Sequence, residues 1–515
     1  MSSVLLADDC GTTRYDCAVY YVTHHELASA IRVLNEELLQ SPQDLKALNL
    51  LGIALTESGQ TDSADGKFEK ALAIDPDFYP ARKNLAINEF NQRHFQEAAA
   101  DLARVLEKLP NDEIAHIYLA EIAFRKNEFT TAVQNYKKAL SRIAQSSAWT
   151  LHYAESLVKC GERPQAAAVL QSLPEKDGEA RFKGGLILGE AGDYKGAAIL
   201  FSSARNNSAD PYLAGYNQIL MLIRAEDYAD AINAFNQMID EGYGRAELYN
   251  LVSDAYLKSG DLKQAYDSLR TATRLEPKAE DNYVDLVALC LDDQDYDLAL
   301  EILDVGKHYV PNSYRLYVQR GFTLVMKGRT QDAETEFLAA SHLAPDKSLP
   351  YIALGEVWMQ IGQAQKAADM LRAKSKLPGA DFLIPYVFAE ALIRSGADAG
   401  TPVAAEAMAA LERSIQLNPK FAHSRAELGK LLLKEGKTEQ AIPELKLATE
   451  LDPNDSGPFY QLGQAYRKTG QKAKADQMLE RVAELHSPEH ELDMNRELRR
   501  LVKQDTAASE TKVKP

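Results

Sequence analysis

Two cysteines and two adjacent histidines near the amino terminus are the residues best placed by type for metal chemistry. They are Cys10, Cys17, His24 and His25. None of them has the paired C-x₂₋₄-C spacing of a zinc site. Together with Cys160 and Cys290 the chain has four cysteines, which are too few and too scattered for a disulfide framework and fit a reducing compartment. We therefore predict no metal site and no cofactor, and we assign Cys290 to packing.

Two further motifs could carry chemistry but lack essential parts. The run from Asp292 to Asp297 has no glycine and no closing glutamate, so it reads as a solvated turn between helices and not as a calcium loop. Gly184, Gly185 and Gly189 do not follow a strand, which excludes a phosphate loop. Neither a Ser/His/Asp nor a Cys/His arrangement has an identifiable scaffold. The sequence predicts that the protein is not an enzyme.

Charge and hydropathy limit the partners and the location. The 515 residues carry a formal net charge of −17, which opposes the phosphate neutralisation that nucleic-acid binding requires. No eighteen apolar residues run together, so no transmembrane segment is expected. The short apolar stretch Val4–Ala7 is followed at once by Asp8 and Asp9, which is not a signal peptide. We predict a soluble, cytoplasmic protein, or an exported one if the true start lies upstream.

A fixed period organises almost the whole chain. Alanines recur in steps of 34, with one step of 31 and one of 40, at positions 30, 64, 98, 132, 166, 197, 231, 265, 299, 333, 367, 407, 441 and 475. A large apolar residue follows each of them four positions later, and a glycine often precedes it by five. Such self-similarity is typical of a helical repeat array.

Each window predicts a two-helix hairpin. In the window from Ala246, Tyr249, Val252 and Tyr256 lie on one helical face, and Gly260 supplies a left-handed helix end. Ala265 then lies on the inner face of a second helix, where a small residue lets the two backbones approach. One hairpin cannot bury its apolar face alone, so the hairpins must stack.

These windows resemble tetratricopeptide repeats, whose pattern is best kept in Leu51, Gly52, Ala64, Phe68, Ala71 and Pro76 and in Leu428, Gly429, Ala441, Leu445, Ala448 and Pro453. The resemblance implies an all-α solenoid, a superhelix of about fourteen repeats. Cys17 and Ala18 stand in the Leu-Gly positions of the first window. We place the repeats at 11–44, 45–78, 79–112, 113–146, 147–177, 178–211, 212–245, 246–279, 280–313, 314–347, 348–381, 382–421, 422–455 and 456–489. An N-terminal segment (1–10), a capping helix (490–504) and a disordered tail (505–515) complete the assignment.

The resemblance further implies a concave groove, lined by a second stripe on the first helix of each repeat, where partner proteins or peptides lie. Four apolar residues fall on this stripe and are expected to be exposed anchors: Ile117, Phe124, Phe182 and Tyr216. The family's chaperone-binding members hold a carboxylate with paired Lys and Asn, a set that is absent here. A non-catalytic interaction scaffold is the predicted function. One alternative is a regulatory or substrate-selecting subunit of a multi-protein enzyme or of an export or assembly complex. Another is RNA recognition, against which the acidity argues.

Acidic residues gather in the windows at 246–279 and 280–313. Residues 276–304 hold ten Asp or Glu and one basic residue, Lys278. Helical spacing predicts one acidic wall on two adjacent first helices, formed by Glu247, Asn250 and Asp254 and by Asp281, Asp285 and Asp292. Such a wall would bind a basic segment of a partner; alternatively, the charges only keep the solenoid soluble. Neither the partner nor the oligomeric state follows from the sequence.

Overall fold

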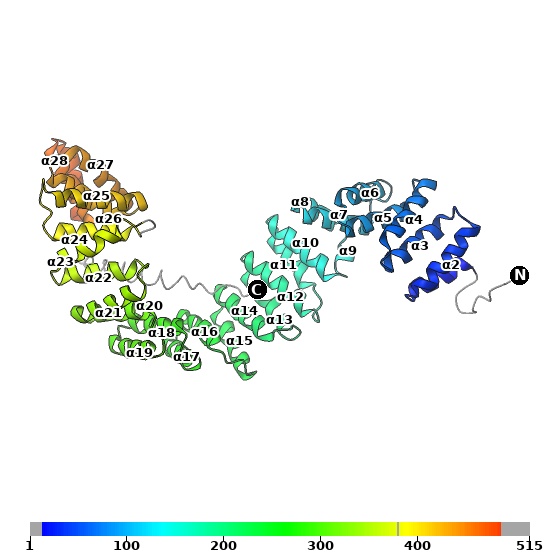
Figure 1. Cartoon of the computed structure of the whole chain (residues 1–515), viewed down its shortest axis with the longest axis horizontal. Coiled ribbons are helices and arrows are strands. Elements are labelled where there is room, and N and C mark those ends of the chain that lie inside the picture. The colour runs from blue at the N-terminus through cyan, green and yellow to red at the C-terminus, as the bar shows by residue number, and fades with distance from the viewer. Residues whose placement is uncertain (1–12, 378–380, 486–515) are drawn as a thin grey trace. The chain divides into compact units, whose positions relative to one another are not determined.

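The computed structural model describes residues 13–377 and 381–485, and these residues form 29 helices and no strand. The all-α solenoid predicted from the repeat is therefore confirmed. The chain divides into two compact units, the first ending at Tyr243 and the second beginning at Gly244. Figure 1 shows that successive helices pair as hairpins within each unit. The segments 1–10, 490–504 and 505–515 of the sequence-based assignment lie outside the described residues, and the repeat boundaries stay a prediction.

The first unit contains fifteen of the described helices. They are α1 (Arg14–Thr23), α2 (Leu27–Gln40), α3 (Leu45–Glu57), α4 (Thr61–Ile74), α5 (Tyr79–Asn91), α6 (Phe95–Lys108), α7 (Glu113–Arg125), α8 (Phe129–Tyr136), α9 (Leu140–Ile143), α10 (Ser147–Lys159), α11 (Arg163–Gln171), α12 (Gly178–Glu190), α13 (Tyr194–Arg205), α14 (Pro211–Arg224) and α15 (Tyr228–Asp240). The pairing is irregular around α9, a single turn that the period does not predict.

The second unit contains the remaining fourteen described helices. They are α16 (Ala246–Ser259), α17 (Leu262–Leu275), α18 (Glu280–Asp292), α19 (Tyr296–Tyr309), α20 (Tyr314–Met326), α21 (Thr330–Leu343), α22 (Leu349–Gln360), α23 (Ala364–Lys374), α24 (Leu383–Arg394), α25 (Pro402–Leu417), α26 (Ala422–Lys434), α27 (Thr438–Leu451), α28 (Ser456–Lys468) and α29 (Lys472–Leu485). Here α16 is the first helix of its hairpin, and first and second helices alternate from there. None of the helices that the structure describes combines the length and apolar content that a membrane-spanning segment needs.

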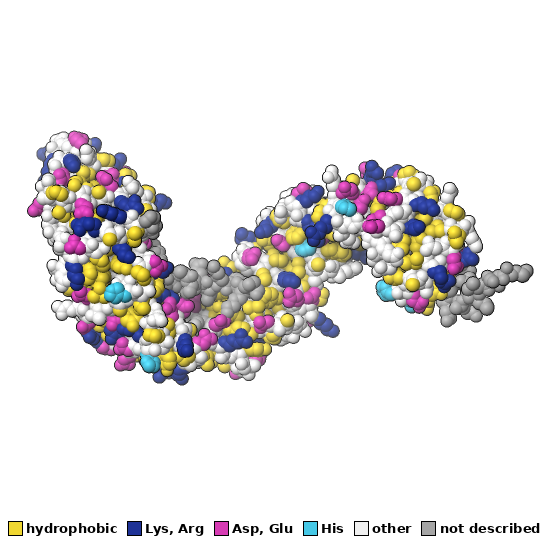
Figure 2. All heavy atoms as spheres, in the orientation of Figure 1, with side chains coloured by type: hydrophobic (Ala, Val, Ile, Leu, Met, Phe, Trp, Pro, Cys, Tyr) yellow, Lys and Arg dark blue, Asp and Glu magenta, His cyan; other side chains and the backbone are white. Residues whose placement is uncertain are grey.

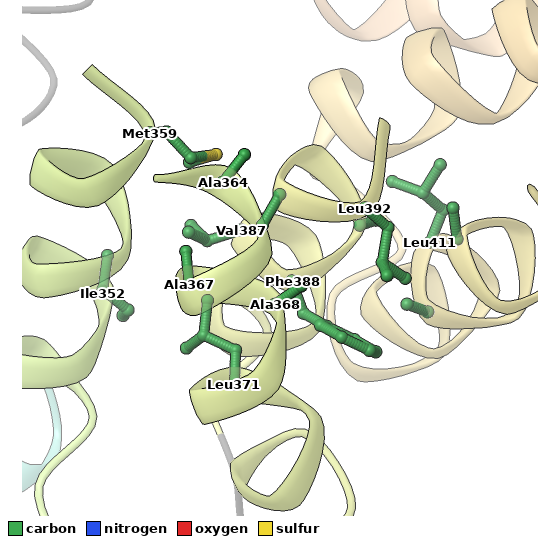
Figure 3. Close-up of a cluster of buried hydrophobic side chains, with 14 of the residues drawn as sticks. Ile352, Met359, Ala364, Ala367, Ala368, Leu371, Val387, Phe388, Leu392 and Leu411 are labelled. Atoms are coloured by element: carbon green, nitrogen blue, oxygen red, sulfur yellow. The ribbon is translucent and has the colours of Figure 1, made fainter. Parts of the chain in front are cut away.

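The recurring alanines form the contact between the two helices of each hairpin. All fourteen of them are completely buried, and the large residue four positions later is buried in every hairpin but the last described one. Figure 3 shows one such region, where Leu371 of α23 lies near Val387 of α24. Small side chains thus bring the backbones together, and the large ones pack against the first helix of the same hairpin, as Phe337 does over Gly321.

The turn inside each hairpin requires one left-handed residue. Nine of the fourteen equivalent positions hold a glycine with positive φ, among them Gly260 at 88°. The other five hold His25, Arg93, Asn127, Glu226 and Gln294, with φ between 60° and 69°. The same turn therefore forms without glycine, at a cost in backbone strain.

Candidate partner-binding surfaces

Most of the residues that could have carried out chemistry instead lie in the hydrophobic core or in turns between helices. Cys290 is buried in α18, as predicted, and burial raises the pKa of its thiol to about 11. The run from Asp292 to Asp297 spans the end of α18 and the start of α19, as predicted. Cys17 is buried and takes part in a disulfide, which differs from the reducing compartment expected from the four cysteines, while Cys160 is a free thiol. Within residues 13–377 and 381–485, no group of three His, Cys, Asp or Glu side chains could hold a metal ion.

The apolar stripe predicted on the first helices is not an exposed row of anchors. Ile117 on α7 is completely buried and Tyr216 on α14 is only 4% exposed, so the prediction of exposure is wrong for both. Phe124 and Phe182 are half-buried. The reason is that α7 packs against α5 and α10, and α14 against α13 and α15. Apolar side chains at this position fill the seams between helices and do not line an open surface.

A polar cluster that the sequence analysis missed joins α7 to α10. The buried carboxylate of Glu121 accepts a hydrogen bond of 2.6 Å from the Tyr136 hydroxyl and lies 2.9 Å from Nδ1 of His152. The ring of Phe124 stacks on His152 at 4.3 Å between centroids. This carboxylate is satisfied by its neighbours, so the cluster ties two repeats together and leaves Phe124 as a partly open aromatic face.

The acidic residues on α16 and α18 do come together in part. We call Asp254, Asp281 and Asp285 the acidic surface, because the charges of Asp281 and Asp254 both act on the carboxyl of Asp285. The side-chain amide of Asn250 donates a hydrogen bond to the side-chain oxygen of Asn282, which links α16 to α18. The two other predicted members lie at helix ends: Glu247 in the first turn of α16 and Asp292 as the last residue of α18.

Two basic residues of the chain itself neutralise part of this surface. Lys258 pairs with Asp254 at 2.9 Å, one turn along α16. Arg315 on α20 contacts Asp281 at 2.5 Å and Glu280 at 2.8 Å. Since four carboxylates, including Asp285, thus face two cations, an excess of negative charge stays exposed.

Asp285 is the least compensated member of the acidic surface. Its side chain is exposed, yet the protein around it limits its hydration and raises its pKa to about 6. The negative charges of Asp281 and Asp254 act in the same direction, and Arg315 opposes them. A positively charged group of a partner would remove this repulsion.

A second polar surface, which the sequence analysis also missed, centres on Tyr386 of α24. The Tyr386 hydroxyl donates a hydrogen bond of 3.1 Å to Glu390 on the same helix. Its ring packs edge-on against Phe421, 5.1 Å away, and Phe421 stacks on His423 at 5.2 Å. All of these side chains are half-buried, so they form an open face across α24 and α26.

In Figure 2, acidic, basic and apolar side chains alternate on the visible face of the molecule.

Two carboxyl groups, on the first helices of adjacent repeats, interact with each other beside Tyr386. Glu356 on α22 and Glu390 on α24 are 34 residues apart, at the same position of consecutive windows. Reduced hydration, together with the charge of Glu390 and a hydrogen bond to it, raises the pKa of Glu356 to about 7. Burial also raises the pKa of Glu390, while Tyr386 and Arg394 oppose the rise. The 34-residue spacing of the two glutamates can be read from the sequence. Their raised pKa values could not be predicted, because they depend on the packing of α22 against α24.

Family models and curated relatives of this chain agree in pointing to one kind of repeat. Two family models, both described as tetratricopeptide repeat, match residues 83–148 and 216–280 and residues 123–186, 404–458 and 432–491. The TPR repeat-containing protein YpiA of Bacillus subtilis is 22% identical over 374 residues, which are 71% of this chain and 87% of YpiA. The peroxisomal targeting signal receptor of Kluyveromyces lactis is 28% identical over 122 residues, 24% of this chain and 21% of the receptor. The structure of yeast Tom70 aligns with 84% of this chain and 97% of its own, at 17% identity and a TM-score of 0.35.

Proposed function

Because this chain belongs to the tetratricopeptide repeat family, we propose that it binds partner proteins or peptides on the first helices of its repeats and catalyses no reaction itself. The proposed site is the acidic surface of Asp254, Asp281 and Asp285. The partner that fits it carries a basic segment. Proteins of this family generally mediate interactions and complex assembly, and one relative is named as a receptor for a targeting signal.

The observation that carries the proposal is the incomplete neutralisation of the acidic surface. Arg315 is already shared by Glu280 and Asp281, and Lys258 lies beside Asp254. Asp285 has no Lys or Arg within 4 Å among the ion pairs of the described residues. A basic segment would pair with this excess and would also be attracted from a distance at low salt.

The proposal is tested by capture of partners on the immobilised full chain, followed by mass spectrometry. The variant Asp254→Asn, Asp281→Asn and Asp285→Asn should lose at least one stoichiometric partner that the wild type retains. A matched control, Asp267→Asn, Asp293→Asn and Glu301→Gln, removes the same charge from exposed positions off this surface and should retain that partner. Equal loss in both variants would mean that net charge alone attracts the partner, which would contradict a defined site.

A further inference from the structure

The face around Tyr386 contains two neighbouring carboxyl groups, of Glu356 and Glu390, that form no ion pair with a basic residue in the described part of the chain. Among the ion pairs of the described residues, neither Glu356 nor Glu390 has a Lys or Arg nitrogen within 4 Å. Glu427 on α26 also faces Tyr386, but it is paired with Lys430 at 3.0 Å. Two carboxyl groups and a hydroxyl are therefore left as acceptors on one face.

Aromatic rings adjoin these acceptors. Phe382 lies 5.0 Å from Phe421, which in turn contacts Tyr386 and His423. The four rings are half-buried and span two repeats. A cation above such rings is attracted by their negative faces, and more strongly where water is partly excluded. The combination of rings and carboxyl groups favours a cationic ligand over an apolar or an anionic one.

The number of acceptors distinguishes between cations. A lysine ammonium has three N–H donors and no acceptor. Glu356, Glu390 and the oxygen of Tyr386 offer three acceptors around one place, whereas a planar guanidinium is best matched by a single carboxylate held side-on. We propose that the face formed by Glu356, Tyr386, Glu390, Phe421 and His423 binds a lysine side chain of a partner protein. This inference rests on the proposed function, because it adds a second recognition point on the same series of first helices.

Proton release accompanies this binding. With no partner present, the raised pKa of Glu356, about 7, means that the glutamate pair retains a proton near neutral pH. An ammonium group displaces that proton into solvent, since both carboxylates are then stabilised by the new charge. Arg394 lowers the pKa of both glutamates, and the charges of Glu427 and His423 act on Glu390 in opposite directions. Affinity for lysine should therefore fall as the pH falls through 7.

The test uses the full chain and a defined probe, the fluorescein-labelled peptide Gly-Phe-Lys-Phe-Gly, with norleucine in place of lysine as its neutral counterpart. Fluorescence anisotropy should show that the lysine peptide binds about tenfold more tightly than the norleucine peptide at pH 8. One proton with a pKa near 7 predicts about tenfold weaker binding at pH 6. The variant Glu356→Gln with Glu390→Gln should lose both the preference and the pH dependence. The control Glu412→Gln with Glu439→Gln, exposed on second helices, should retain them.

Several results would overturn the inference. One is that the wild type fails to bind the lysine peptide, or that it binds the norleucine peptide equally tightly. Another is that the Glu356→Gln, Glu390→Gln variant binds the lysine peptide as tightly as the wild type does. A pH dependence that persists in that variant would assign the effect to His423 and would also overturn it. The proposed function is tested separately, by whether the Asp254, Asp281 and Asp285 variant loses the natural partner. That result does not depend on binding of the peptide.

Discussion

The ring of Phe201 lies where a side chain on Gly185 would begin: its Cε1 atom is 2.8 Å from the position of a Cβ atom on that glycine. The two residues belong to α12 and α13, the two helices of one hairpin. A rigid, completely buried ring cannot move aside as the end of a flexible chain could. The absence of a side chain at Gly185 thus sets how closely the two helices approach.

Gly185→Ala is expected to destabilise the first unit by about 1–3 kcal/mol, because overpacking outweighs the better helix propensity of alanine. Urea unfolding followed by circular dichroism measures the change. Gly66→Ala is the matched control: Gly66 lies inside α4 with nothing near its Cβ position. It should stabilise by about 0.5–1 kcal/mol. The same sign for both substitutions would contradict this account of the hairpin contact.

Glu226→Gly should increase the free energy of unfolding by about 0.5–1 kcal/mol. Glu226 holds a φ of 61° at a turn where nine other repeats have glycine, and glycine adopts this conformation without strain. Thermal or urea denaturation gives the difference. Glu226→Ala removes the same side chain but keeps the strained backbone, so it should bring no such gain; equal stabilisation by alanine would refute the argument.

Tyr136→Phe should cost about 1–2 kcal/mol, since the buried carboxylate of Glu121 loses a hydrogen bond of 2.6 Å. Equilibrium unfolding in urea provides the measurement. Tyr153 is also buried in the neighbouring helix α10, and among the described residues its hydroxyl is not part of this cluster. Tyr153→Phe should therefore change stability by less, about 0.5 kcal/mol. A similar loss of unfolding free energy in the two variants would mean that the hydrogen bond to Glu121 does not stabilise the fold.

The stability of the second unit should depend on pH through Glu356. Its pKa rises from 4.5 to about 7 on folding, so the folded chain binds the proton more tightly than the unfolded chain between those values. The contribution of Glu356 to stability is therefore full below pH 4.5, is lost as the pH rises through 7, and changes little beyond that. Glu356→Gln should gain about 1–2 kcal/mol over the wild type at pH 8 and almost nothing at pH 4. Urea titrations at both pH values test this, and a gain that is equal at both would contradict it.

The register of the fold was largely predictable, because the 34-residue period determines which side chains meet inside a hairpin. The alanine at position 265 and its equivalents are buried for that reason. The same period marks the five turn positions without glycine, such as Arg93. The single turn α9 was not predictable, since neither proline nor glycine lies at the break after Tyr136.

The surfaces were less predictable than the fold. Exposure at the position of Ile117 depends on how neighbouring first helices pack, and a repeat pattern does not describe that seam. The excess of acid around Asp285 was visible in the sequence, but its neutralisation by Arg315, thirty residues further on, was not. Likewise, the spacing of Glu356 and Glu390 is evident, whereas the rise in their pKa values depends on burial.

Carboxyl footprinting of the full chain, alone and with its captured partner, tests most directly whether partners bind on the first helices. Labelling by carbodiimide and glycine ethyl ester, read by mass spectrometry, reports each exposed Asp and Glu separately. Binding on the first helices predicts that Asp254 and Asp285 lose reactivity with the partner, while Asp267 on α17 and Glu301 on α19 keep theirs. Protection of Asp267 and Glu301 with unchanged labelling of Asp254 and Asp285 would place the partner on the second helices and contradict the proposed function.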